Sequence, residues 1–350
     1  MVKKESPMRL KAIQKSDFRD FVRKLLLSNR DVVGVKSRNG TFVFDRLESF
    51  DDLRLDYTAT LLPPKKYLLP QHDTLLKYRV GAKLQVEEQI EAPDRILLGV
   101  HPYDIKAICQ ADLYFSEEPR DVHYMMRREK TTIVGIDPIN VGAKSFCSVM
   151  NSAVVDAGFD LMLTDIGDRY VVEIGSQKGE RLLMESCRSA DASDKDKKAR
   201  DEVRKKSPCF FTEQEPHFTA EELPELLGKS ESHPVWEQLG DKCLSCGSCI
   251  LVCPSCFCFD VRDDVDLNLV DGHRFRQWDG CVLEDFAKVG TGENFRKTRV
   301  DRYRHRFYRK GEYLFKKLGS PACVGCGRCV TACLPDIANP VRVYNTLKEG

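Results

Sequence analysis

The 350-residue sequence lacks any segment that would direct the chain across a membrane or hold it there. It opens with Met-Val-Lys-Lys-Glu-Ser-Pro, without an apolar core and cleavage site. No apolar run approaches the roughly 20 residues that a membrane helix needs. The net charge is also close to zero, because the chain has 55 basic and 54 acidic side chains. This balance favours neither nucleic acid nor membrane as a partner. We therefore expect a cytoplasmic protein with no membrane span.

Familiar catalytic motifs are missing as well. The sequence contains no G-x-G-x-x-G after a predicted strand, no P-loop and no H-E-x-x-H, and its seven histidines show no ligand spacing. We therefore expect a non-catalytic protein, in which any flavin or nicotinamide that reacts is bound by another subunit.

Cysteine, in contrast, is abundant. Of fifteen cysteines, eleven follow residue 240, and in a protein without a secretion signal such thiols favour metal ligation over disulfides. Two runs follow the pattern C-x2-C-x2-C-x3-C, which is typical of cubane iron–sulfur clusters. Structural zinc sites use two separated pairs of ligands, so zinc is the weaker interpretation. The candidate ligands are Cys243, Cys246, Cys249 and Cys253 in the first run, and Cys323, Cys326, Cys329 and Cys333 in the second.

The two runs together predict two [4Fe–4S] clusters. In two-cluster ferredoxins the fourth cysteine of one run ligates the other cluster. The same crossover here predicts one cluster on Cys243, Cys246, Cys249 and Cys333, and another on Cys323, Cys326, Cys329 and Cys253. We favour this arrangement because it places the clusters close enough to exchange electrons.

Three further cysteines exceed the eight ligands that two clusters need. Cys256 and Cys258 follow the first run, and Cys281 lies in Trp-Asp-Gly-Cys. Unpaired cysteines are among the most buried residues, so simple packing explains them. Alternative ligation or a third metal centre, completed by a non-cysteine ligand, is the other interpretation.

The distribution of cysteine divides the chain and predicts an α+β fold. Residues 1–188 are expected to form a mixed α/β domain, and residues 189–240 a charged, proline-containing linker region. Residues 241–350 are expected to form a largely helical ferredoxin-type domain with two clusters.

Hydrophobic periodicity and turn residues predict the elements of the first domain. The expected helix is Asp17–Leu27. The expected strands are Val32–Val35 and Thr41–Phe44 as a hairpin, Arg95–Val100, Thr132–Ile136, and Asp160–Thr164 with Tyr170–Ile174 as a second hairpin. The charged stretch Ser189–Ser207 has no apolar stripe, which indicates a solvated helix or linker.

A basic stretch, Phe295–Lys317, lies between the two cysteine runs and looks helical. Its arginines and lysines have three candidate roles: tuning of the clusters or docking of an acidic partner, a plain solvated surface, or a nucleic-acid patch with interleaved aromatics. The near-zero net charge argues against nucleic acid.

The motifs also resemble a known family. Cys253-Pro-Ser-Cys-Phe-Cys-Phe-Asp260, Trp278-Asp-Gly-Cys281, Asn294-Phe-Arg296, Arg302-Tyr-Arg-His-Arg306 and Cys323-Val-Gly-Cys-Gly-Arg-Cys329 are similar to segments of dicluster electron-transfer subunits. These include the β subunits of sulfhydrogenases, the dicluster subunits of anaerobic sulfite reductases, and those of flavin oxidoreductases linked to heterodisulfide-reductase-type partners. The upstream segments Leu98–Asp104, Asp112–Phe115 and Asp160–Gly179 extend the resemblance over most of the chain.

The resemblance implies a relay role within a hetero-oligomer. A flavoprotein partner that binds NAD(P)H would exchange electrons with the clusters, and a catalytic redox subunit would lie on their other side. The alternative is a redox enzyme whose N-terminal α/β domain itself binds a substrate or flavin beside the clusters.

This chain departs from the family at three places. The early loop commonly reads Arg-Pro-Cys-Asp, but here reads His101-Pro-Tyr-Asp104, and a cysteine-rich segment is reduced to Asn140–Cys147. Leu334 replaces the proline that usually follows the fourth cysteine. Because Cys109 and Cys147 alone cannot complete a cubane site, we expect two clusters in the chain and not three.

Overall fold

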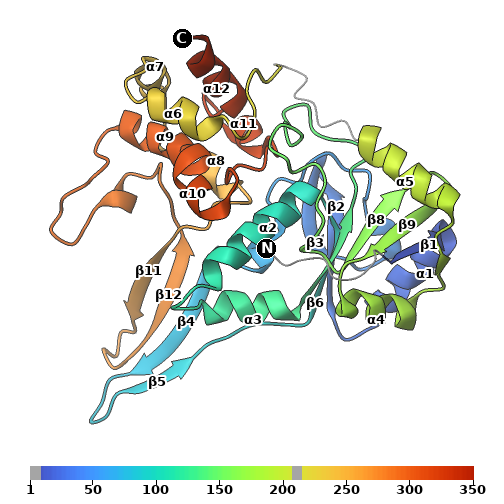
Figure 1. Cartoon of the computed structure of the whole chain (residues 1–350). Helices are drawn as coiled ribbons and strands as arrows, with labels where there is room; N and C mark the ends of the chain where they lie inside the picture. The colour runs from blue at the N-terminus through green and yellow to red at the C-terminus, as the bar shows by residue number, and fades with distance from the viewer. Residues whose placement is uncertain (1–8, 207–214) are drawn as a thin grey trace.

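The computed structural model describes residues 9–206 and 215–350, which form two β-sheets and a group of helices beside them (Figure 1). The described strands are β1 (Leu10–Gln14), β2 (Asp31–Arg38), β3 (Thr41–Arg46), β4 (His72–Arg79), β5 (Gln85–Glu88), β6 (Arg95–Val100), β7 (Thr131–Ile136), β8 (Leu161–Asp165), β9 (Arg169–Ile174), β10 (Ala190–Asp191), β11 (Phe259–Val265) and β12 (Asp271–Trp278). The described α-helices are α1 (Lys15–Leu26), α2 (Pro102–Phe115), α3 (Val122–Lys130), α4 (Gln177–Ser186), α5 (Asp194–Lys206), α6 (Leu223–Lys229), α7 (Val235–Gly240), α8 (Ser248–Leu251), α9 (Arg299–Tyr308), α10 (Phe315–Leu318), α11 (Arg328–Ala332) and α12 (Pro340–Glu349). The α+β fold class is confirmed.

The larger sheet has eight strands in the order β10-β1-β9-β8-β7-β6-β2-β3. Its centre, β2-β6-β7-β8, is parallel, and the flanking pairs are antiparallel. Every residue of β7 is buried, as expected where helices cover both faces of parallel strands. The strands predicted at 95–100 and 132–136 are confirmed as β6 and β7.

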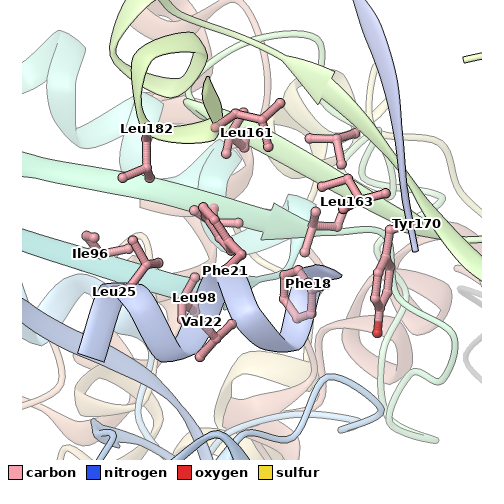
Figure 2. Close-up of a cluster of buried hydrophobic side chains, with 14 of the residues drawn as sticks. Phe18, Phe21, Val22, Leu25, Ile96, Leu98, Leu161, Leu163, Tyr170 and Leu182 are labelled. Atoms are coloured by element: carbon pink, nitrogen blue, oxygen red, sulfur yellow. The ribbon is translucent and has the colours of Figure 1, made fainter. Parts of the chain in front are cut away.

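Helix α1 covers one face of this sheet and confirms the helix predicted from apolar spacing. Phe18, Phe21, Val22 and Leu25 are buried on its inner side and lie against strand side chains such as Leu98, as Figure 2 shows. The four positions recur at helical spacing because only one side of the helix faces the core.

The two predicted hairpins are also present. Strands β2 and β3 pair in antiparallel register around Asn39 and Gly40, whose φ angles are 50° and 75°. Asparagine and glycine tolerate such positive φ angles, and this explains the turn signal in the sequence. Strands β8 and β9 pair in the same way.

Helix α5 confirms that the charged stretch Ser189–Ser207 contains a helix, although Ser207 lies outside the described residues. One of its faces is not solvated. Arg204 Nε donates to Asp137 Oδ2 at 2.7 Å and Arg204 Nη1 donates to Glu173 Oε2 at 3.2 Å, and both carboxylates are buried. Ion pairs therefore take the place of an apolar stripe in anchoring this helix.

A second, four-stranded sheet, in the order β11-β12-β4-β5, was not predicted from the sequence. Its strand β4 comes from the N-terminal part of the chain and pairs with β12, which lies between the two cysteine runs. The spacer between the runs therefore contains a hairpin as well as helices. Figure 1 shows this sheet extending away from the larger one.

The expected helix over Phe295–Lys317 is interrupted. Thr298 caps α9 through a capping box with Asp301, and a π-helical turn at Arg309–Tyr313 separates α9 from α10. A π turn shifts the helical register by a fraction of a turn, and such turns are frequent at functional sites.

Within the described residues, none of the helices has both the length and the apolar character that a membrane crossing requires.

A buried ion network ties β4 to β12 and α3. Asp73 accepts two hydrogen bonds from Arg127, at 2.6 and 2.8 Å, and one from Arg276 Nε at 3.0 Å. Burial alone would raise the pKa of Asp73, but the two guanidinium groups outweigh it and lower the pKa below its usual value. Breaking such a pair leaves a buried charge without a partner.

We therefore predict that Asp73→Ala lowers the free energy of unfolding by about 3–5 kcal/mol at neutral pH. Because the folded-state pKa is lowered, the contribution of Asp73 is fully present above the unfolded pKa of about 3.9 and is lost as the pH falls towards the folded value. Chemical denaturation at several pH values measures both effects. The matched control is Asp263→Ala, whose partner Arg274 is on the surface, and a much smaller loss is expected there. Equal losses in the two variants would contradict the prediction.

Candidate iron–sulfur centre

Both cysteine runs fold in the same way. Each has a glycine in the left-handed region, Gly247 with φ 75° and Gly327 with φ 76°, directly before a short helix, α8 or α11. The third cysteine lies in that helix and the fourth follows its end. At Gly327 an added Cβ would lie 2.4 Å from the carbonyl oxygen of Lys144, so the loop needs glycine both for its φ angle and for close packing.

The two short helices contact each other, and this contact brings cysteines from both runs into shared cavities. The first cavity is lined by Cys243, Cys246, Cys249 and Cys333. The second is lined by Cys253, Cys323, Cys326 and Cys329. These are the same two groupings of cysteines that a ferredoxin-type crossover predicts.

The spacing of the thiols fits a multi-atom group better than a single ion. Within residues 9–206 and 215–350, no three His, Cys, Asp or Glu side chains converge closely enough to hold one metal ion. Burial raises the pKa of Cys249 and of Cys323 to about 12. As free thiols these residues keep their protons, and binding of iron must displace them.

Arg306 of α9 lies between the cavities and lines both of them. Its side chain is 5% exposed, and its Nε has no hydrogen-bond partner. Burial lowers the pKa of Arg306, but Cys249, Cys329, Cys253 and Cys256 outweigh it and hold the pKa well above the usual value. A buried guanidinium surrounded by thiols, with an unused donor, fits the negative charge and sulfur acceptors of thiolate-bound clusters.

Two lysines complete the positive charge around the cysteines. Lys310 Nζ is buried and donates to the carbonyl oxygen and to Oγ of Ser255, at 2.7 and 2.9 Å. Lys65, from the N-terminal part of the chain, donates to the carbonyl oxygen of Cys256 at 2.6 Å and lies 4.1 Å from the centre of the Trp278 ring. The surroundings of the cysteines are thus built from distant parts of the chain.

Comparison with known proteins agrees with this geometry. Residues 242–337 match the family model of the 4Fe-4S dicluster domain. Over 344 residues the chain is 33% identical to the sulfhydrogenase 2 subunit beta of Pyrococcus furiosus, and the alignment covers 98% of this chain and 99% of that protein. The chain belongs to the dicluster [4Fe–4S] electron-transfer subunit family. Its cofactors are [4Fe–4S] clusters. No solved structure matches the chain.

In this family member the two upstream segments that depart from the family pattern pack against the second cysteine run. Arg328 of the second run donates to both carboxylate oxygens of Asp104, at 2.6 and 2.7 Å, and both side chains are buried. Tyr103, at the position of the family's cysteine in Arg-Pro-Cys-Asp, packs in a buried group with Cys147 and Cys326. The N-terminal part of the chain thus holds the second cysteine loop through an ion pair and apolar packing.

The remaining cysteines fall into two groups. Cys256, Cys258 and Cys281 line a third cavity. Cys109 and Cys187 lie in the N-terminal part, where Cys109 contacts Ala157 and Cys187 contacts Asp17. Cys209 lies outside the described residues.

Part of the basic stretch points inward, and the sequence had left the role of this stretch open among several. Arg302, Arg306 and Lys310 are buried and recur every four residues, which places them on one face of the helical segment. Of the three, Arg306 and Lys310 line the second cavity, and their spacing of four residues was the signal for it. The contributions of Lys65 and Asp104 had no such signal, because each depends on a contact between distant parts of the chain.

Since Arg306 is a positive charge beside both cavities, we predict that Arg306→Gln lowers the reduction potentials of the clusters. A loss of about 1.4 kcal/mol in stabilisation of the reduced form corresponds to about 59 mV for a one-electron couple. Redox titration followed by electron paramagnetic resonance measures the shift, and Arg306→Lys should restore part of it.

The control for this prediction is Arg304→Gln on the same helix. Arg304 donates to the carbonyl oxygen of Glu231 instead of facing the cavities, so its removal should leave the potentials unchanged. Equal potentials in the Arg306 variant and the unaltered protein would show that the guanidinium does not act on the clusters.

Proposed function

We propose that this protein relays electrons in the cytoplasm between a flavoprotein partner that binds NAD(P)H and a catalytic redox subunit of hydrogenase, sulfite reductase or heterodisulfide-reductase type. The similar Pyrococcus protein is by name one subunit of a sulfhydrogenase, and this supports membership of a hetero-oligomer. Cys243, Cys246, Cys249 and Cys333 would hold one [4Fe–4S] cluster, and Cys253, Cys323, Cys326 and Cys329 the other. Each bound cluster would supply one-electron redox chemistry.

The observation that carries this proposal is the position of Arg306. One side chain lines both cysteine cavities, so the two sites lie within reach of a single residue. A relay needs such closeness, whereas two unrelated structural clusters do not. The buried cation also favours the reduced form of a bound cluster, because reduction adds negative charge.

The first cavity reaches the surface, and this suggests where a partner docks. Cys246 is exposed, while Cys326 and Cys329 of the second cavity are buried. Two apolar side chains next to the first set of cysteines are also exposed, Leu244 by 57% and Leu334 by 86%. Exposed apolar residues beside a redox site fit the core of an interface with a partner protein.

We predict that NAD(P)H alone does not reduce the purified, cluster-loaded protein, because the sequence contains no recognised nucleotide-binding motif. Addition of the flavoprotein partner should permit reduction. Anaerobic absorption spectroscopy, with loss of the iron–sulfur absorbance as the readout, measures both states. Turnover with stoichiometric flavin in the isolated protein would instead support the alternative, an enzyme whose N-terminal domain binds flavin or substrate.

We also predict that the double variant Leu244→Asp with Leu334→Asp slows electron transfer from the partner by at least about tenfold, which corresponds to a loss of about 1.4 kcal/mol in association. Its iron content should not change, because neither side chain is a candidate ligand. The control is Leu267→Asp, which replaces an exposed apolar residue at the tip of the β11–β12 hairpin. Electron transfer at the normal rate in the double variant would exclude this surface as the docking site.

A further inference from the structure

The three surplus cysteines that follow residue 240, Cys256, Cys258 and Cys281, lie together. Strands β11 and β12 form an antiparallel ladder that starts with the pair Phe259 and Trp278. Cys258 and Asp279 lie just outside this end, where Asp279 N donates to the carbonyl oxygen of Cys258 at 3.2 Å. Cys256 and Cys281 follow on the two sides, and all three cysteines line one cavity. The hairpin therefore gathers thiols that are distant in the sequence.

This third cavity adjoins the cluster sites. The loop before Cys281 is packed so tightly on α8 that a Cβ added to Gly280 would lie 2.5 Å from Ile250 Cδ1. The Cys253 Sγ, in the lining of the second cavity, lies 3.5 Å from Oγ of Ser255, which lines the third cavity, and the two groups form a hydrogen bond. Arg306 lines the third cavity as it does the other two. Cys281 is 5% exposed, so the site is enclosed by protein.

The walls of the cavity carry excess positive charge. Arg306, Arg309 and Lys310 line it, and the one carboxylate among its described lining residues is Asp279. Arg306 and Lys310 are buried, and burying cations is costly without negative charge nearby, which three neutral thiols do not supply. Thiolates bound to an anionic group provide that charge.

No three potential metal ligands in the described part of the chain are placed as a mononuclear site requires, in which zinc has its ligands about 2.0–2.3 Å from one centre. A cluster of several iron and sulfide atoms instead takes thiolates that are spread around it.

We propose that Cys256, Cys258 and Cys281 hold a third iron–sulfur cluster, with the Asp279 carboxylate as its fourth ligand. The site adjoins both other cysteine cavities, because Arg306 lines all three. It does not depend on which partners the protein serves.

The test is a count of iron, sulfide and zinc in the full-length chain, loaded with clusters and purified without oxygen. The proposal predicts about twelve irons per chain, and about eight in the double variant Cys258→Ala with Cys281→Ala. The matched control, Cys187→Ala, removes a cysteine at the end of α4 and should retain all of the iron. About eight irons in the unaltered chain, or zinc lost in place of iron in the double variant, would overturn the proposal.

A second variant tests Asp279 as the fourth ligand. It also keeps the proposal testable if the double cysteine variant does not fold. Asp279→Ala should lose about one iron per chain and show the electron paramagnetic resonance signal of a [3Fe–4S] cluster when oxidised. Asp285→Ala, which removes a nearby exposed carboxylate, should show neither change. An Asp279 variant with full iron content and an unaltered spectrum would exclude Asp279 as a ligand. These counts need no partner protein, so their outcome is separate from that of the relay experiments.

Discussion

The C-terminal part of this protein depends on one buried charge, the guanidinium of Arg306. Moving such a group from water into protein costs several kcal/mol unless negative charge accompanies it. The groups that hold its pKa high are cysteines. Thiolates that carry iron supply a fixed negative charge, whereas protonated thiols do not. Cluster binding and the packing of α9 are therefore linked: the helix can bury its inner face at low cost only when the cysteines are ligated.

Buried charges with partners of opposite sign also join the N-terminal and C-terminal parts of the chain. Arg328 brings the second cysteine loop to Asp104 at the start of α2, and Asp73 joins the smaller sheet through Arg127 and Arg276. Buried ion pairs contribute little net stability but are costly to break. They fix how the N-terminal part of the chain lies against the cysteine cavities, where Lys65 donates to the carbonyl oxygen of Cys256.

Local signals in the sequence predicted the parts of the structure that depend on neighbouring residues. The cysteine spacing predicted which thiols share each cavity, and apolar periodicity predicted α1, β6 and β7. The β11–β12 hairpin was missed because it pairs with β4, about 200 residues earlier, and its exposed strand β11 alternates only weakly. The break between α9 and α10 was also missed, since no proline or glycine pair marks the π turn. Long-range contacts of this kind leave no pattern within a short window of sequence.

Each cavity is lined by cysteines from both runs, and this determines when during synthesis its four cysteines are all present. The first cavity takes Cys333 and the second takes Cys329, so neither set of four is complete until the last run has left the ribosome. Eighty residues separate Cys253 from Cys333, which takes about 4–16 s at about 5–20 residues per second. During that interval the thiols of the first run are present without their full set of partners. Filling of either of these two cavities therefore waits until the second run has been made, and a fragment that ends before Cys329 completes neither of these two sets.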